Sequence, residues 1–457
     1  MQKVLGKTSR IHFIGIGGIG MSGLALICYN LGFEITGSDI KRSSVIEELK
    51  KLGIKVKIGH KKENITKADV VIYSTAIKED NCEILEAKRL GIPVIHRAEL
   101  LAELTRIKNS ICISGTHGKT TTSSMIGAVL EKGGLRPTTI IGGIVKGKSQ
   151  ARYGKGDYLV CEADESDKSF LRLLPSYAII TNIEPEHLEY YKDLRDIEDN
   201  FVYFANHVPF WGCVFLGADS PSSLSIKDRI KRRVILYGLS KDAYLRAYEL
   251  EKVNFGVRFK VLWRNGYIGR FEINVPGQHN VLNSLAAIGI GLELEIPLCK
   301  IKDALKTFKG VHRRIEYHGS INKIMIFEDY GHHPTEISVT LQTLKDYFPD
   351  KRIISVFQPH RYTRTYHLFD QFSRAFIFAS IVIVTEIYPA HELPIPGING
   401  EALARRIGKE QGDVYFIESF KKITKFLKQV GKPGDIIVVQ GAGDINRIIP
   451  LIFKELR

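Results

Sequence analysis

The sequence predicts an α/β protein of three consecutive domains: a Rossmann-like N-terminal domain, a central phosphate-loop domain with a β-rich extension, and a C-terminal α/β domain. Short apolar strands alternate with amphipathic helices almost throughout the 457 residues, which is typical of parallel sheets with crossover helices. That length is roughly three times an ordinary domain. Between about Tyr244 and Val275 a β-rich alternation, with Asn265-Gly266 as its hairpin turn, replaces this pattern. We expect domains at residues 1–105, 106–313 and 314–457.

The composition excludes a mainly disordered or collagen-like chain. Hydrophobic residues make up 44% and charged residues 25% of the chain, close to globular averages. No apolar run approaches the roughly 18 to 20 residues that span a bilayer. The apolar stretch from Ile11 to Cys28 is interrupted by glycines, so we interpret it as a strand, a turn and a helix, not as a signal peptide. The 6 cysteines include no C-x-x-C pair, which favours a reducing, cytoplasmic location.

The net charge of +15 comes from 65 basic and 50 acidic residues. Such a charge is typical of nucleic-acid binders and of enzymes with several anionic substrates. No run of five basic residues and no aromatic–basic RNA signature is present. We therefore attribute the charge to lysines on solvated helix faces, and we expect no nucleic-acid partner.

A glycine turn, Gly-Ile-Gly-Gly-Ile-Gly at residues 15–20, follows the first expected strand and opens a helix. It matches G-x-G-x-x-G, in which glycines let the backbone approach a diphosphate at a helix N-terminus. Asp39 ends the next strand, where an acid can accept hydrogen bonds from a nucleotide. The alternative is a tight turn without a ligand, and the motif leaves the nucleotide open. The strands expected here are Ile11–Gly15, Glu34–Ser38, Lys55–Ile58, Val70–Ser74 and Pro93–Ile95.

The central domain carries a phosphate loop, Gly-Thr-His-Gly-Lys-Thr-Thr at residues 115–121. Its core, Gly118-Lys119-Thr120, places a lysine on the β/γ-phosphates and a hydroxyl on Mg²⁺. The leading glycine is only three positions before Gly118, so this is a shortened variant of the usual pattern. The loop predicts ATP binding. The elements expected here are strands at Ser110–Ser114, Tyr158–Cys161 and Tyr177–Thr181, a helix from about Lys119, and a closing helix after Gly277.

Two acidic clusters follow consecutive strands beside this loop, at residues 162–167 and 184–187. Acid clusters are usually solvated loops. These two end neighbouring strands at the edge of the sheet where ligands bind. Carboxylates, a threonine hydroxyl and the imidazole of His187 can hold Mg²⁺ against ATP, so we expect a metal site.

The third domain offers two features for a small carboxylate substrate. Arg361 and Arg364 are three residues apart, so on a first helical turn they point the same way. His332 and His333 precede Pro334 at an expected helix start. A zinc site at this histidine pair is the alternative, but no third ligand lies nearby in the sequence. The strands expected here are Ile324–Phe327, Arg352–Phe357, Ile381–Thr385, Val414–Ile417 and Asp435–Gln440.

Seven motifs spread over all three domains together resemble the Mur ligases. In order they are Gly15-Ile-Gly-Gly-Ile-Gly-Met21, Gly115-Thr-His-Gly-Lys-Thr-Thr-Thr122, Glu162-Ala-Asp-Glu-Ser-Asp167, Thr181-Asn-Ile-Glu184, Gly277-Gln-His-Asn-Val-Leu-Asn283, Asp329-Tyr-Gly-His-His-Pro-Thr-Glu336 and Phe357-Gln-Pro-His-Arg-Tyr-Thr-Arg-Thr365.

The resemblance implies a role for each motif residue. The UDP-sugar would contact Gly15, Gly17, Gly18, Gly20, Asp39, Ser74, Thr75 and Arg97. ATP would contact Gly115, Thr116, His117, Gly118, Lys119, Thr120, Thr121, His279, Asn280, Asn283, Arg314 and Asp329. The Mg²⁺ ligands, with Mn²⁺ as a possible substitute, would be Thr120, Glu162 and His187; Lys119, Glu162 and His187 would act in catalysis. L-Alanine would contact Tyr330, His332, Arg361 and Arg364.

Four residues depart from the pattern that the family usually shows. Glu186, Glu189 and Glu328 stand where aspartates are usual, and His391 stands where glycine is usual. The longer acids bear on the metal geometry, and His391 bears on the shape of a loop near the amino-acid site.

The implied activity is ATP-dependent joining of L-alanine to the lactyl carboxylate of UDP-N-acetylmuramate through an acyl phosphate. We expect the enzyme to be a monomer or homodimer. The alternatives are a ligase that attaches a recycled tripeptide to the same sugar, a nucleotide-dependent dehydrogenase favoured only by the glycine turn, and a non-catalytic ATP-binding regulator.

Overall fold

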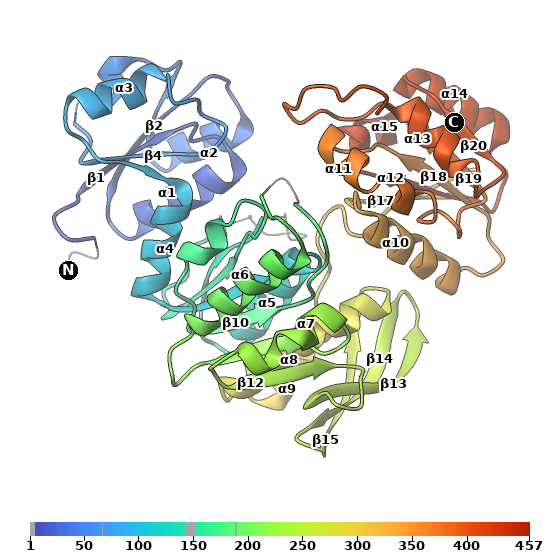
Figure 1. The fold of residues 1–457 in the computed structure, drawn as a ribbon, viewed down its shortest axis with the longest axis horizontal. Coiled ribbons are helices and arrows are strands. Elements are labelled where there is room, and N and C mark those ends of the chain that lie inside the picture. The colour runs from blue at the N-terminus through green and yellow to red at the C-terminus, as the bar shows by residue number, and fades with distance from the viewer. Residues whose placement is uncertain (1–4, 66, 143–150, 188–189) are drawn as a thin grey trace.

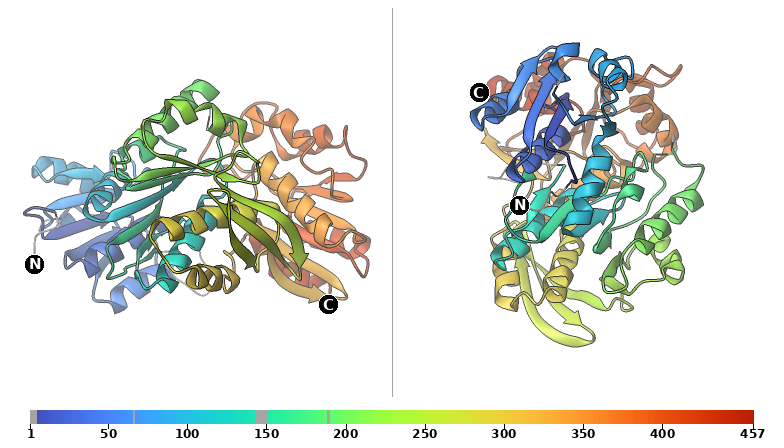
Figure 2. Two further views of the ribbon diagram at one scale, coloured as in Figure 1. Left: turned by 90° about the horizontal axis from the view of Figure 1, so that it is seen from below. Right: turned by 90° about the vertical axis from the view of Figure 1, so that its left-hand side faces the viewer.

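The computed structural model describes residues 5–65, 67–142, 151–187 and 190–457. It contains sheets of five, ten and six strands, each formed by one contiguous part of the chain. The N-terminal and C-terminal parts both flank the central part (Figures 1 and 2). The expected α/β architecture with three consecutive domains is confirmed.

The N-terminal sheet is parallel, with strand order β3-β2-β1-β4-β5. The strand order reverses between β1 and β4, and ligands of open parallel sheets bind in the crevice outside such a reversal. The glycine turn lies there, directly after β1. The strands are β1 (Arg10–Ile14), β2 (Glu34–Asp39), β3 (Lys55–Ile58), β4 (Val70–Tyr73) and β5 (Val94–His96), and the helices are α1 (Ile19–Asn30), α2 (Ser44–Lys51), α3 (Cys82–Arg89) and α4 (Arg97–Ile107).

The central sheet has the order β15-β14-β13-β12-β11-β10-β6-β9-β7-β8. Its strands are parallel from β7 to β13, and β8, β14 and β15 are antiparallel to their neighbours. The strands are β6 (Asn109–Ser114), β7 (Thr138–Ile140), β8 (Ala151–Arg152), β9 (Tyr158–Glu162), β10 (Tyr177–Ile180), β11 (Cys213–Gly217), β12 (Val234–Gly238), β13 (Leu245–Val253), β14 (Gly256–Trp263) and β15 (Gly266–Ile273). The helices are α5 (Lys119–Lys132), α6 (Leu194–Asn206), α7 (Pro221–Ser225), α8 (Gln278–Glu293) and α9 (Leu298–Lys306).

Three features of this domain differ from the sequence analysis. No strand was predicted for β7, β8, β11 or β12; β11 and β12, which are buried on both faces, are short continuous apolar runs without a distinctive period. The hairpin turn consists of Arg264 and Asn265, both with positive φ, and Gly266 already opens β15. The helix after Gly277, α8, does not close the domain, since α9 follows it and packs against α5.

The C-terminal sheet has the order β16-β17-β21-β18-β19-β20, with only β16 antiparallel to its neighbour. The strands are β16 (Glu316–Ile321), β17 (Ile324–Asp329), β18 (Ile353–Phe357), β19 (Ile381–Val384), β20 (Val414–Phe416) and β21 (Ile436–Gln440). The helices are α10 (Pro334–Tyr347), α11 (Tyr362–His367), α12 (Phe369–Phe372), α13 (Gly400–Ile407), α14 (Phe420–Val430) and α15 (Ile448–Glu455).

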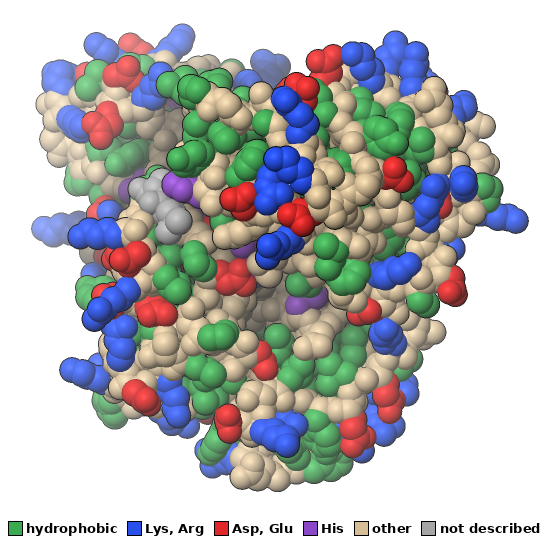
Figure 3. All heavy atoms as spheres, turned by 45° about the vertical axis from the view of Figure 1, so that its right-hand side comes forward, with side chains coloured by type: hydrophobic (Ala, Val, Ile, Leu, Met, Phe, Trp, Pro, Cys, Tyr) green, Lys and Arg blue, Asp and Glu red, His purple; other side chains and the backbone are tan. Residues whose placement is uncertain are grey.

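The surface does not gather its positive charge into one patch on the face drawn in Figure 3, where Lys and Arg side chains alternate with Asp and Glu. This agrees with the interpretation of lysines scattered over solvated helices. Within the described ranges, no helix combines the length and the apolar character that crossing a membrane requires.

Candidate active site

The phosphate loop leaves β6 and enters α5 in a conformation that requires its two glycines. Gly115 has φ +126° and Gly118 has φ +86°, both in the left-handed region. A Cβ on Gly118 would lie 2.6 Å from Oδ1 of Asn283, and one on Gly115 would collide with the Thr181 hydroxyl. The loop is therefore packed tightly between β10 and α8. Asn283 accepts a hydrogen bond from Thr122 (3.0 Å), which fixes α8 against the first turn of α5.

Lys119 is folded back onto its own loop. Its Nζ donates to the carbonyl oxygens of Gly115 (2.5 Å) and Thr116 (3.2 Å) and to Oε1 of Glu165 (2.6 Å). Burial raises the pKa of the Glu165 carboxyl to about 7, although the nearby Lys119 ammonium opposes that shift. Glu165 is thus a partner of Lys119. It belongs to the motif at residues 162–167, but the sequence did not indicate this role for it. Phosphate oxygens in the loop would compete with Glu165 for the ammonium.

Two of the three expected metal ligands lie together. Glu162 accepts the Gly142 N–H (2.8 Å), and the Thr120 hydroxyl beside it acts to lower the pKa of its carboxyl. Burial raises the pKa of Glu162 above its usual value, as happens when a carboxylate lacks a full counter-charge. A buried carboxylate beside a threonine hydroxyl is a suitable donor set for Mg²⁺. His187 lies on the loop after β10 and lines a cavity of about 20 Å³ together with Arg361 and Arg364.

A cavity of about 420 Å³ lies between the central and C-terminal domains. Eight of the twelve residues expected to bind ATP line it: His117, Gly118, Thr121, His279, Asn280, Asn283, Arg314 and Asp329. The other four, Gly115, Thr116, Lys119 and Thr120, are on the adjoining phosphate loop.

The cavity also has a wall that the sequence analysis missed. Asp219, Ser220 and Tyr237 line it, and they lie on or directly after β11 and β12. Because these strands were not predicted, nothing in the sequence placed their ends beside the phosphate loop. The only signal was the pair of apolar runs at residues 213–217 and 234–238.

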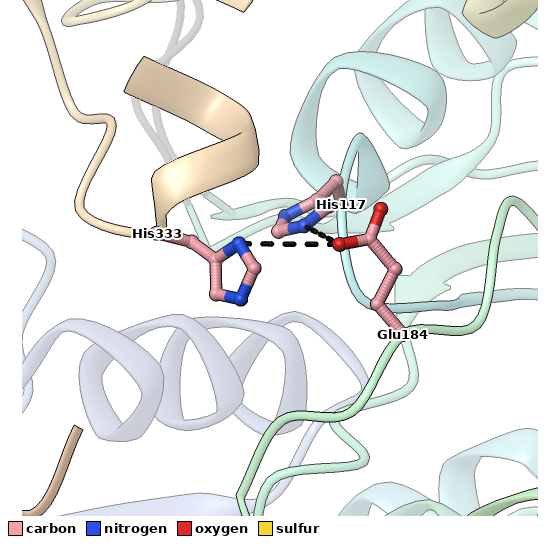
Figure 4. Close-up of side chains that lie close together, drawn as sticks. All are labelled: His117, Glu184 and His333. Carbon is pink, nitrogen blue, oxygen red and sulfur yellow. Dashed lines mark ion pairs between the residues drawn. The ribbon is translucent and has the colours of Figure 1, made fainter. Parts of the chain in front are cut away.

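The C-terminal domain contacts the phosphate loop through a cluster of His117, Glu184 and His333 (Figure 4). His117 Nε2 lies 3.4 Å from Glu184 Oε2, and His333 Nδ1 lies 4.0 Å from the same oxygen. One ligand atom of each residue lies within 4.8 Å of the others. No third metal ligand lies near the histidine pair in the sequence. In the structure, however, His117 and Glu184 of the central domain lie close enough to His333 to serve as ligands. His332 instead faces Tyr330, with Nδ1 3.0 Å from the Tyr330 carbonyl oxygen.

Glu336, at the start of α10, joins the parts of the site. Its Oε1 lies 3.3 Å from His117 Nδ1 and 3.4 Å from Arg314 Nη1. Its Oε2 accepts the backbone N–H groups of His332 (3.1 Å) and His333 (3.4 Å), the latter as part of a capping box. One buried carboxylate thus links the phosphate loop, an expected ATP residue and the amino-acid side of the site. Glu336 belongs to the motif at residues 329–336, but no role was predicted for it. Pro334 followed by Glu336 is the sequence signal for such a helix start.

The charge of His117 should make the stability of the protein depend on pH. Burial lowers the pKa of this imidazole, but Glu184 and Glu336 outweigh burial and raise it to about 10. A raised folded-state pKa stabilises the protein fully below the unfolded value of about 6.5 and loses that contribution as pH rises through about 10. We expect the melting-temperature difference between the wild type and His117→Gln to shrink over this window. A difference that stays constant with pH would contradict the ion pairs; His207→Gln, outside the cluster, is the control.

The expected amino-acid residues lie around the start of α11. Arg364 contacts Glu186 Oε1 through Nε (3.1 Å) and Nη2 (3.0 Å), and Arg361 Nε lies 3.9 Å from Glu392 Oε1. The two guanidiniums share the small cavity with His187. Each therefore already has a carboxylate partner, and one partner, Glu186, comes from the central domain.

The departures from the family pattern have distinct surroundings. Glu186 pairs with Arg364, which lowers the pKa of its carboxyl despite its burial. Glu189 lies outside the described residues. His391 has φ +72°, a conformation that favours glycine. We expect His391→Gly to be tolerated, with a change in unfolding free energy within about 1 kcal/mol, because relief of strain offsets the greater chain entropy of glycine. Chemical denaturation would measure it, and a loss of several kcal/mol would show that the imidazole has a structural role.

The expected UDP-sugar residues meet at the carboxyl edge of the N-terminal sheet. Asp39 Oδ2 accepts the Gly17 N–H (2.9 Å) and Oδ1 accepts the Lys41 N–H (3.1 Å), so this carboxylate holds the glycine turn. Arg97, at the start of α4, lies over the turn: a Cβ on Gly20 would be 3.1 Å from its Nη1. Gly15, with φ +74°, and Gly18, the N-cap of α1, complete the turn, and Ser74 and Thr75 directly follow β4.

Comparison with known proteins gives matches along the whole chain. Three family models match in order: the Mur ligase catalytic domain at residues 10–109, the Mur ligase middle domain at 113–291 and the Mur ligase glutamate ligase domain at 313–443. The UDP-N-acetylmuramate–L-alanine ligase of Sulfurihydrogenibium sp. (strain YO3AOP1) is 49% identical over 452 residues, covering 99% of this chain and 98% of the relative. The enzyme of the same name from Persephonella marina is 47% identical, covering 99% and 98%.

Solved structures show the same fold. The UDP-N-acetylmuramate–alanine ligase of Thermotoga maritima superposes with a TM-score of 0.80 at 30% identity, covering 97% of this chain and 98% of that one. A murein peptide ligase from Psychrobacter arcticus superposes with a TM-score of 0.69 at 24% identity, covering 98% of each chain.

Proposed function

This chain belongs to the Mur ligase family, and from that premise we propose that it joins L-alanine to the lactyl carboxylate of UDP-N-acetylmuramate, with ATP as the energy source. The observation that carries the substrate assignment is the 49% identity, over 99% of the chain, to a relative of that name. The arrangement of the site supports the reaction type, because a phosphate loop, a nucleotide-sized cavity and an arginine pair converge where the central and C-terminal domains meet.

Activation of the carboxylate requires transfer of the ATP γ-phosphoryl group, which depends on charge neutralisation and alignment. When ATP binds, Lys119 would donate to phosphate oxygens in place of Glu165. Its positive charge would then lie beside the transferred group. Thr120, Glu162 and His187 are the residues that would hold Mg²⁺. When bound, that ion would neutralise the charge that develops on the phosphates.

The amine of alanine must be neutral when it attacks the acyl phosphate. Burial lowers the pKa of His332 to about 4, so its ring is neutral near pH 7. Nδ1 faces the Tyr330 carbonyl oxygen and donates to it (3.0 Å), which leaves the lone pair on Nε2. His332 would therefore position the amine through Nε2, because an imidazole with so low a pKa is a weak base. The new amide forms as phosphate leaves the tetrahedral intermediate.

Arg361 and Arg364 would bind the carboxylate of alanine, and this assignment predicts a specific kinetic change. Arg361 Nε lies 3.9 Å from Glu392 Oε1, a longer contact than the 3.0 Å between Arg364 Nη2 and Glu186 Oε1. We expect Arg361→Ala to raise the KM for alanine by about tenfold or more, the value of a lost charge-assisted hydrogen bond, with little change in the KM for ATP. Arg405→Ala, on the exposed surface of α13, is the matched control. An unchanged alanine KM would remove Arg361 from the site.

ATP-dependent phosphate release in the presence of UDP-N-acetylmuramate tests the proposed function. We expect L-alanine to support turnover in a panel of amino acids. Turnover with an L-alanine-containing tripeptide but not with free alanine would assign the recycling reaction. A change in NADH absorbance without phosphate release would assign a dehydrogenase, and ATP binding without turnover would assign a regulator.

A further inference from the structure

Two carboxylates are forced together where the C-terminal domain begins. In the antiparallel pair β16–β17, Glu316 lies directly opposite Glu328, so both side chains point to the same face of the sheet. They are only 8% and 3% exposed. Like charges directly opposite one another destabilise a strand pair, and buried carboxylates require compensation.

Two imidazoles approach the same carboxylates. The strand register shifts between Tyr317 and Gly319, which leaves His318 as the extra residue of a β-bulge; bulges redirect side chains in this way. His318 Nε2 lies 2.8 Å from Glu328 Oε2. His312, in the segment before β16, places Nδ1 2.9 Å from Glu316 Oε1. One imidazole nitrogen thus lies beside each of the two carboxylates, and all four residues belong to one short stretch of chain.

One arginine contacts both carboxylates. Arg313 Nε lies 2.6 Å from Glu328 Oε1, and the Arg313 backbone N–H donates to Glu316 Oε2 (2.8 Å). Its guanidinium also donates to the carbonyl oxygens of Gly441 (2.7 Å) and Gly443 (3.3 Å). Arg313 occupies the Glu328 oxygen turned away from His318, as an outer partner that orients a metal-ligating carboxylate does.

We propose that Glu316, His318 and Glu328, with His312 as a fourth ligand, form a zinc site in the C-terminal domain, separate from the expected Mg²⁺ ligands. One ligand atom of each of the first three residues lies within 4.8 Å of the others. Imidazole nitrogens and carboxylate oxygens are ordinary tetrahedral Zn²⁺ ligands. The side chains of His318 and His312 are 29% and 44% exposed, so an ion can enter from solvent.

The position of the site predicts a coupling to the ATP cavity. Arg313 and Glu328 are the chain neighbours of Arg314 and Asp329, which line that cavity. Zinc would tie His312 and β16 to β17 and so hold these two neighbours in place. Because an ion that binds only the folded state stabilises it, zinc should also raise the melting temperature.

Titration of the full-length protein with Co²⁺ as a spectroscopic probe, in excess Mg²⁺, tests the proposal, with Zn²⁺ as the competitor. We expect one equivalent of Co²⁺ to give the visible absorption of a tetrahedral site, and Zn²⁺ to abolish it. His318→Ala and His312→Ala should each weaken Co²⁺ affinity by about tenfold or more, while His207→Ala, in the central domain, should not. Metal-free melting curves would confirm that each variant is folded.

Three results would overturn the proposal. The first is the absence of saturable one-equivalent binding to the wild type. The second is wild-type affinity in both His318→Ala and His312→Ala. The third is loss of the signal in His333→Ala with retention in His318→Ala, which would assign the ion to the cluster of His117, Glu184 and His333. None of these results depends on turnover, so they leave the proposed ligase reaction to its own test.

Discussion

Lys119→Ala is expected to abolish ATP-dependent phosphate release while leaving the affinity for the UDP-sugar unchanged. The Lys119 ammonium donates to two carbonyl oxygens of the phosphate loop and is already desolvated there. Removing such a preorganised charge costs roughly 100- to 1,000-fold in turnover. The proposed UDP-sugar residues lie in a different domain, so binding of that ligand should not respond.

Phosphate release and isothermal titration with the UDP-sugar would measure the two halves of this prediction. Lys132→Ala is the matched control, because Lys132 ends the same helix and pairs with Asp303 on the surface (2.8 Å); it should behave as the wild type. Full turnover by Lys119→Ala would refute the proposed role of the phosphate loop.

Glu336→Gln is expected to impair ATP use through a residue outside the expected ATP set. The amide can still accept the His332 N–H, but it cannot neutralise His117 or Arg314, which both approach Glu336 Oε1. Breaking one side of a buried ion pair costs several kcal/mol in general. We expect the KM for ATP to rise by about tenfold or more, corresponding to about 1.4 kcal/mol.

Steady-state kinetics at varied ATP would measure this effect, and a UDP-sugar titration would show that the N-terminal site is unaffected. Glu401→Gln is the matched control, since Glu401 also lies in the first turn of a helix, α13, but forms its ion pair with the exposed Arg405 (3.8 Å). A wild-type KM for ATP in Glu336→Gln would mean that this carboxylate only caps the N-terminus of α10.

Local patterns were enough to predict much of the fold. The glycine turn and the phosphate loop could be predicted because each lies between a strand and a helix. Their glycines indicate backbone conformations that other residues rarely adopt. The strand β3 was predicted with its observed bounds, and most others within one or two residues. Strands β7, β8, β11, β12 and β16 were not predicted. For β11 and β12, burial on both faces removes the alternation that identifies a strand. Their loss hid Asp219, Ser220 and Tyr237 from the predicted site.

The sequence by itself determined the strand–loop–helix units and the residue types that suit a nucleotide, since those depend on neighbours in the chain. Only the tertiary structure decided which residues meet. Glu184 and Glu336 come from different domains to the two nitrogens of His117, 3.4 and 3.3 Å away. A single β-bulge brings His318 to Glu328. Such contacts depend on domain packing and strand register, and neither leaves a periodic signal in the sequence.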